Sequence, residues 1–422
     1  MSHATLIWPH VPTDDFNDLA ARFRPVFDTI REGAAARDRD RQLPHEAVAL
    51  LRDSGFGKLR VPKSFGGFGT SLTTLFALLT ELAEADSNLT QILRGHFGFI
   101  EIVLPHTNAD WSRRWLTLAG QGALFAPAHT EPGDSQHGTF STVVTGDGDA
   151  IELNGTKYYT TGALYVDWIH VTANRGDEVV TVLVSTKAEG VTIVDDWDGF
   201  GQPLTASGTT TFTGVAIKEA DIQPAAGRAS HVPSVYQLIH LATLSGIGRA
   251  AVRETVDYLA KRRRTYAHGN ADRAQQDPQI LQVVGDVLAK VYGANTATLS
   301  AAAASQRFFD KLTTHVATEA DRASLEIEVY QAQVSTATQV LEATTALFGG
   351  LGASALSQTR GLDRFWRNAR AIASHNPLIY RSRQIGDFAV NDVDPPRMFS
   401  LPLEPIPEAK IVASDVPRRR YS

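Results

Sequence analysis

The sequence predicts a mainly helical α+β protein with a helical N-terminal part, a central β unit and a C-terminal four-helix bundle. Three observations support this fold class. Apolar residues recur at helical spacing over roughly the first 120 residues, short β-branched runs fill the stretch from about 123 to 222, and long helical stripes return after Pro233. We therefore expect domains at residues 1–122, 123–230 and 231–392, followed by an extended tail at 393–422.

The N-terminal helices are indicated by their apolar spacing. Between residues 15 and 54, side chains such as Phe16, Leu19 and Phe23 lie three to four positions apart. A glycine-rich loop follows, and Ser71 is a suitable N-cap for the next helix because its hydroxyl can accept a hydrogen bond from the first turn. A further helical segment runs from about 90 to 104.

The central unit and the bundle have different patterns. Short β-branched runs at 151–162, 168–174, 179–186 and 209–217 are separated by Gly, Asn and Asp, which is typical of an antiparallel barrel or small sandwich. Four long apolar stripes then occupy residues 235–264, 278–313, 319–348 and 361–390. In the last stripe an arginine recurs every third residue from 364 to 370, and Asn376 should end or kink the helix because it precedes Pro377.

Composition excludes several classes of protein. A formal charge of −6 from interspersed charges does not predict a nucleic-acid partner. The absence of cysteine removes disulfides, thiolate metal sites and a cysteine nucleophile, and we expect no metal. The N-terminus has no basic run followed by an apolar core, and no apolar run approaches 18 residues. A cytoplasmic protein without a membrane segment is the default expectation.

Four short motifs carry a family resemblance when they are taken in order. They are VPKSFGGFG at 61–69, LNGTK and YTTG at 153–157 and 159–162, RRTY at 263–266, and LFGGLG at 347–352. In this order and spacing the chain resembles the acyl-CoA dehydrogenase superfamily from about residue 15 to 392. The resemblance implies that Tyr159, Thr160 and Thr161 lie against a flavin. It also implies that Arg263 reaches the flavin phosphates, often across a subunit interface, and that the turn of Phe348, Gly349 and Gly350 lies beside the cofactor.

The chain departs from the family at the catalytic base. A dehydrogenase of this family needs a carboxylate to remove the α-proton of an acyl thioester, because that proton is weakly acidic. The resemblance places this base at Asn376, beside His375, or at Ile239. Neither residue is a carboxylate, so α,β-dehydrogenation lacks its central group.

The same departures resemble a branch of the superfamily, the reduced-flavin-dependent monooxygenases such as dibenzothiophene monooxygenase. In that branch a histidine followed by Asp or Asn and Pro replaces the catalytic glutamate, as His375 and Asn376 do before Pro377. The branch also implies a second catalytic histidine at His96 and a hydroxyl near the reactive edge of the flavin at Thr161. We expect the substrate pocket to include Phe97, Phe125 and Ile239.

The resemblance implies a two-component system. A separate flavin reductase would supply FMNH2, and a flavin C4a-hydroperoxide formed with O2 would oxygenate a small apolar or heteroatom-bearing (S, N or aromatic) substrate. Ala346 stands where FAD-dependent members commonly have glutamine, which favours FMN, with FAD as the alternative. A homotetramer is expected. Two alternatives remain: an acyl-CoA dehydrogenase or oxidase with an unrecognised base, and a non-catalytic flavin- or ligand-binding oligomeric scaffold.

Overall fold

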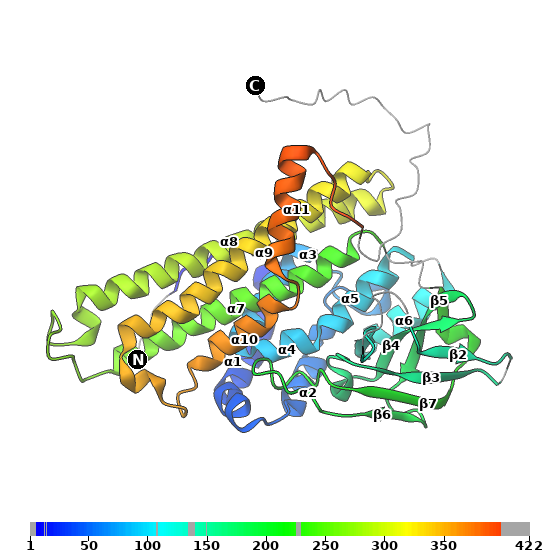
Figure 1. Ribbon diagram of the computed structural model, residues 1–422, viewed down its shortest axis with the longest axis horizontal. Helices are drawn as coiled ribbons and strands as arrows, with labels where there is room; N and C mark the ends of the chain where they lie inside the picture. Colours follow the sequence, from blue (N-terminus) through cyan, green and yellow to red (C-terminus); the bar gives the residue numbers. More distant parts are fainter. Residues whose placement is uncertain are drawn as a thin grey trace.

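The computed structural model describes residues 6–11, 13, 15–106, 109–133, 140–148, 150–224 and 229–397 (Figure 1). The N-terminal helices are α1 (Phe16–Asp40), α2 (His45–Ser54), α3 (Leu72–Ala85), α4 (Ser87–Ile92), α5 (Arg94–Val103) and α6 (Asp110–Gly120). Every residue of α3 is buried, so this helix forms the centre of the N-terminal part. Ser71 caps α3 as the sequence predicts, because its hydroxyl accepts a hydrogen bond from the backbone N–H of Thr74 at 3.0 Å.

The described strands form one sheet of eight. They are β1 (Phe125–Ala128), β2 (Val143–Thr145), β3 (Glu152–Lys157), β4 (Trp168–Arg175), β5 (Glu178–Ser185), β6 (Val191–Ile193), β7 (Thr210–Ala216) and β8 (Ile222–Pro224), in the order β6-β7-β3-β2-β4-β5-β8 with β1 on β4. The sheet is mixed, whereas the sequence predicted an antiparallel unit: β1 pairs with β4 in parallel, with Phe125 opposite Trp168. Two parallel strands need a long crossover connection, because the chain must come back to the same end of the sheet before the second strand begins, and the connection from β1 to β4 is long enough.

Five helices follow the sheet: α7 (Val232–Lys261), α8 (Pro278–Thr313), α9 (Glu319–Leu351), α10 (Asp363–Ser374) and α11 (Leu378–Asn391). Figure 1 shows α7, α8 and α9 side by side along the long axis, with α11 at a steep angle to them, and α11 packs against α9. The fourth predicted stripe is thus two helices, because Pro377 has no N–H to continue the helix and restricts Asn376 before it. Thr318 and Asp321 start α9 with a reciprocal capping box.

The hydrophobic core joins the three parts of the chain. α3 packs against α1, α7 and α8, and α5 packs against β1 and α7. One core cluster therefore contains Phe23 from α1, Val171 from the sheet and Ile239 from α7. The helix, sheet and helix order agrees with the predicted fold class. The domain limits themselves stay a prediction, and most of the predicted tail, residues 398–422, lies outside the described residues. No described helix is long and apolar enough to span a bilayer.

Candidate active site

A cavity of about 680 Å³ opens where the three parts of the chain meet. Its wall contains residues of α4 and α5, of β1 and β4, of the loop between β6 and β7, and of the first turns of α7. The N-terminal part of α9, the end of α10 and Arg381 of α11 complete it. Four of the predicted site residues, Tyr159, Thr161, His375 and Asn376, come together on this wall.

The backbone around the cavity is strained. Tyr159, Gln202 and Ala206 have positive φ values of 60°, 55° and 48°, although none of them is glycine. Each such conformation costs roughly 1–3 kcal/mol, and such residues cluster at functional sites. Tyr159 also keeps 51% of its surface exposed while it lines the cavity and packs against Trp197 at 6.0 Å between ring centroids. Three such residues close to one cavity are typical of a functional site.

Hydroxyl groups form a chain on the sheet side of the cavity. Thr161 Oγ1 lies 2.8 Å from Ser207 Oγ, which in turn lies 2.8 Å from Thr205 Oγ1, and all three residues line the cavity. Thr160, by contrast, is fully buried: its hydroxyl lies 2.7 Å from that of Thr210 and donates to the carbonyl of Gly208 at 3.0 Å. The structure therefore places Thr160 behind the wall, where it holds the loop in position.

A buried ion pair supports the same wall. Lys157 Nζ donates to Glu131 at 2.7 Å and to the carbonyl of His129 at 3.2 Å, and both cationic and anionic side chains are almost fully buried. Burial opposes ionisation of Glu131, but hydrogen bonds from Lys157, Thr142 and Ser141 outweigh it and lower the pKa of the carboxyl to about 2. The lysine of the LNGTK motif thus fixes the segment after β1 that carries His129 into the cavity wall.

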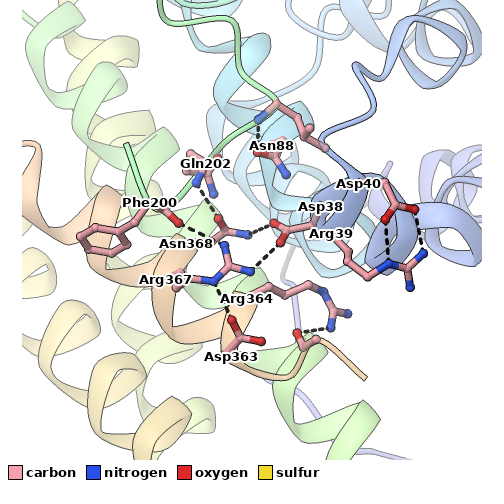
Figure 2. A network of polar contacts seen from close by, with 12 residues as sticks. Asp38, Arg39, Asp40, Asn88, Phe200, Gln202, Asp363, Arg364, Arg367 and Asn368 are labelled. Carbon is pink, nitrogen blue, oxygen red and sulfur yellow. Dashed lines mark hydrogen bonds and ion pairs between the residues drawn. The ribbon is translucent and has the colours of Figure 1, made fainter. Parts of the chain in front are cut away.

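A polar network holds the loop of residues 199–207 from behind (Figure 2). The backbone N–H of Gln202 donates to Asn368 Oδ1 at 2.6 Å, and Arg367 donates to the carbonyl of Phe200 at 3.1 Å. Both side chains are held by Asp38 of α1, which accepts from Arg367 at 2.7 Å and from Asn368 at 3.2 Å. The arginine face predicted for this helix is therefore structural, and it connects α1 and α10 to the cavity wall.

His375 is open to the cavity and lies beside a second histidine. Its ring centroid is 4.4 Å from that of His240, which is almost fully buried on α7. Burial among protein atoms lowers the pKa of His375 to about 3, and the charge of Arg94 adds to this, while a hydrogen bond with Asn376 offsets part of it. Burial, Arg94 and His375 likewise hold the pKa of His240 well below its usual range. Both imidazoles are neutral near pH 7.

Asn376 is held in place from two helices. Its side-chain amide donates to Gln237 of α7 at 2.6 Å, and its backbone carbonyl accepts from Gln333 of α9 at 3.1 Å. The break between α10 and α11 is therefore tied to the bundle, and His375 is presented to the cavity from a fixed backbone.

Acidic groups are scarce on the wall. Of the described residues that line the cavity, Glu326 alone carries a carboxylate. It forms an ion pair with Arg322 at 3.0 Å and accepts from the Tyr330 hydroxyl at 3.4 Å. Burial raises the pKa of Glu326 even though Arg322 lowers it.

Besides Thr160, four predicted site residues are buried behind the cavity wall. His96 is fully buried, with Nε2 at 2.7 Å from the carbonyl of Gly57, and burial lowers its pKa to about 4. Phe97, Phe125 and Ile239 have no exposed surface. Their apolar side chains complete the core under the wall, so the expectation that these three line the pocket is corrected: they support it from behind.

The remaining predicted cofactor residues lie far from the cavity. Gly349 follows Tyr330 by 19 residues along α9, which is about 28 Å at the rise of an α-helix. Arg263, next to the end of α7, is exposed at that same end, where Arg262 donates to the carbonyl of Leu351 at 2.8 Å. Phe348, Gly349 and Gly350 are part of the last turn of α9, not of a separate turn as predicted, and within one chain neither they nor Arg263 meet Tyr159 and Thr161.

Sequence reasoning missed several cavity residues. Arg94, Tyr236 and His170 line the cavity, and His240 lies directly behind His375. His240 follows Ile239, so a shift of one position in the family comparison would have found it. Arg94 had a signal as well, because it is a single cation in an otherwise apolar helical stretch. His170 and Tyr236 sit in ordinary strand and helix patterns that give no local signal.

The chain matches known proteins over most of its length. Models of the acyl-CoA dehydrogenase N-terminal, middle and C-terminal domains match residues 13–123, 126–215 and 238–378. A probable FMNH2-dependent monooxygenase, SfnC of Pseudomonas putida, is 27% identical over 385 residues, covering 89% of this chain and 95% of the relative. Dibenzothiophene monooxygenase of Rhodococcus qingshengii is 26% identical over 393 residues, covering 89% and 94%.

A solved structure shows the same architecture. TdsC of Paenibacillus sp. A11-2, in complex with FMN and indole, superposes with a TM-score of 0.84 at 27% identity, covering 91% of this chain and 99% of that one. The helical, sheet and bundle parts described above correspond to the three matched domain models in the same order. By sequence and by architecture, the chain belongs to the acyl-CoA dehydrogenase family.

Proposed function

We propose that this chain is a monooxygenase that uses FMNH2 and O2 to oxygenate a small apolar or heteroatom-bearing substrate. The observation that carries the proposal is the wall around the end of α10, where His375 and Asn376 face the cavity at the place that the family's dehydrogenases give to a carboxylate base. The relatives and the solved neighbour named above are flavin monooxygenases or bind FMN, which agrees with the function and the cofactor expected from the sequence.

The cavity residues fit an isoalloxazine ring. Three polar atoms that line the cavity, Gln91 Oε1, Gln202 Oε1 and Ser234 Oγ, are buried and have no partner in the described part of the chain. Buried polar groups need partners, and a flavin ring offers both N–H donors and carbonyl acceptors. We assign the hydroxyls of Thr161 and Ser207 on the sheet side to the same ring.

Reduced FMN, when bound, supplies the electrons that let one atom of O2 enter the substrate while the other leaves as water. The protein supplies the surroundings. Val329 and Ile372 make an apolar wall that excludes bulk water. His375 is neutral near pH 7, so one ring nitrogen can donate a hydrogen bond while the other accepts a hydrogen bond from the substrate or from bound water. His240 behind it keeps that imidazole from turning into the core.

The expected partners follow from this function. A separate flavin reductase would supply FMNH2. A second copy of the chain would bring Arg263 and the turn at Gly349 toward the flavin phosphate, since these residues are too far from the cavity of their own chain. This is consistent with the predicted homotetramer. The cytoplasmic location stays a prediction.

Glu326 keeps one alternative open. It is a carboxylate on the cavity wall with a raised pKa, which is the property of a general base, so an acyl-CoA dehydrogenase or oxidase remains the second candidate. Its ion pair with Arg322 and its hydrogen bond from Tyr330 argue against this role, because both contacts engage the carboxylate that would have to accept the proton.

The test is oxygen transfer with chemically reduced cofactor. The full chain is mixed with photoreduced FMN, dibenzothiophene or indole as probe, and ¹⁸O₂, and products are analysed by mass spectrometry. We expect one ¹⁸O atom per product molecule, a loss of about 10²–10⁴-fold in rate for His375→Ala, and unchanged FMN binding. The exposed His10→Ala is the control and should behave as wild type.

The alternative has its own readout. If butyryl-CoA reduces the bound flavin, or exchanges its α-protons with D2O in a reaction that Glu326→Gln abolishes, the chain is a dehydrogenase and the monooxygenase proposal is wrong. Unchanged ¹⁸O transfer by His375→Ala would instead remove only the role of His375.

A further inference from the structure

Arg94 is a cation on the cavity wall, and no acidic side chain among the described residues pairs with it. Its Nε donates to the carbonyl of Tyr236 at 3.3 Å, and its guanidinium lies over the Tyr236 ring at 4.7 Å. These contacts use the face and one nitrogen of the group and leave the two terminal nitrogens for a ligand. We propose that Arg94 binds an oxyanion group of the substrate, a sulfinate, sulfonate or carboxylate, so that the enzyme selects anionic heteroatom compounds.

The charge balance of the cavity favours an anion. Burial lowers the pKa of Arg94 to about 10, and the Tyr236 phenol is the only group in the described part of the chain that offsets this. Among the described lining residues Glu326 carries the one carboxylate, and it is paired with Arg322 and also feels the charge of Arg381, which stacks on Tyr330 at 4.1 Å. Burying a cation without a counter-ion is unfavourable. An oxyanion that accepts hydrogen bonds from the N–H groups of the Arg94 guanidinium would supply the counter-charge.

The neighbours of Arg94 place this subsite on the substrate side. The positive charge of Arg94 acts on both His375 and His240, so the guanidinium lies near the two imidazoles. Tyr236 and His240 belong to α7, Arg94 belongs to α5, and His375 is the C-cap residue of α10. Of the groups assigned to the flavin, the hydroxyls of Thr161 and Ser207 come from the sheet side, whereas Gln91 and Ser234 come from α4 and α7. An anion on Arg94 would therefore hold the reacting heteroatom near His375.

The inference rests on the proposed function but is tested without turnover. Binding of benzenesulfonate and of the neutral methyl phenyl sulfone to the chain loaded with oxidised FMN is measured by titration calorimetry. Because a hydrogen-bonded charge contributes about 1.5–3 kcal/mol, we expect the sulfonate to bind about 10- to 100-fold more tightly. Arg94→Gln should remove this preference, and Arg94→Lys should keep part of it.

The controls separate substrate binding from cofactor binding. Arg39→Gln, a change to an exposed arginine paired with its neighbour Asp40, should leave the preference unchanged. Equal affinity of the wild type for the two probes would overturn the inference, and this measurement needs no variant to fold. It would also be overturned if Arg94→Gln weakened FMN binding and left sulfonate binding intact, since Arg94 would then serve the cofactor. A chain that binds sulfonate but transfers no oxygen would refute only the proposed function.

Discussion

Replacing Asp38 with alanine should loosen the cavity wall from a distance. The Asp38 carboxylate is 3% exposed and accepts from Arg367 at 2.7 Å and Asn368 at 3.2 Å, and these two residues hold Phe200 and Gln202 (Figure 2). Removing one partner of a buried pair costs about 3–5 kcal/mol. Arg367 is 27% exposed and keeps Asp363 at 2.7 Å, so its charge stays partly compensated. We therefore expect a loss of about 2–3 kcal/mol in the stability of this network.

Hydrogen exchange is the suitable assay, because a chain of this size need not unfold in two states. In Asp38→Ala the backbone N–H groups of residues 199–207 should exchange about 30- to 100-fold faster. This factor corresponds to the expected loss of about 2–3 kcal/mol, because that loss makes local opening of the loop more favourable. FMN binding should weaken in parallel. Asp40→Ala, which removes only an exposed pair with Arg39, is the control. If exchange in this loop stays at the wild-type rate while Asp38→Ala folds, the network does not support the wall.

Two further predictions concern packing and pH. A Cβ at residue 98 would lie 2.2 Å from the ring of Tyr236, so Gly98→Ala should displace Tyr236 and weaken binding of benzenesulfonate more than binding of FMN, as measured by calorimetry; equal weakening would contradict the subsite. Burial lowers the pKa of His96 to about 4 and holds the pKa of His240 well below its usual range, which favours their neutral forms in the folded state, so their contribution to stability is complete above about pH 6.5 and is lost as the pH falls toward these lowered pKa values. Urea midpoints measured between pH 7.5 and 4.5 should fall accordingly, and a flat profile would count against these burial effects.

Local sequence predicts the elements well because its signals are local. The cap at Ser71 and the helix break at Asn376 were both found from neighbouring residues alone. The parallel pairing of β1 with β4 was not, since it joins residues more than forty positions apart and leaves no trace in either strand. A pattern of alternating residues gives the strand but not the direction of its partner.

The chemistry at the end of α10 was determined by the sequence itself. The family resemblance implies that His375 and Asn376 stand in place of a carboxylate, and no fold can turn these side chains into a carboxylate base. Which groups surround them was decided only by the tertiary structure. Arg94 lines the cavity, whereas His96, two residues later in α5, is buried. The rotation of α5 and the contacts among α5, α7 and α10 decide this difference. Since one residue along a helix turns a side chain by about 100°, packing selects between neighbours that the sequence treats alike.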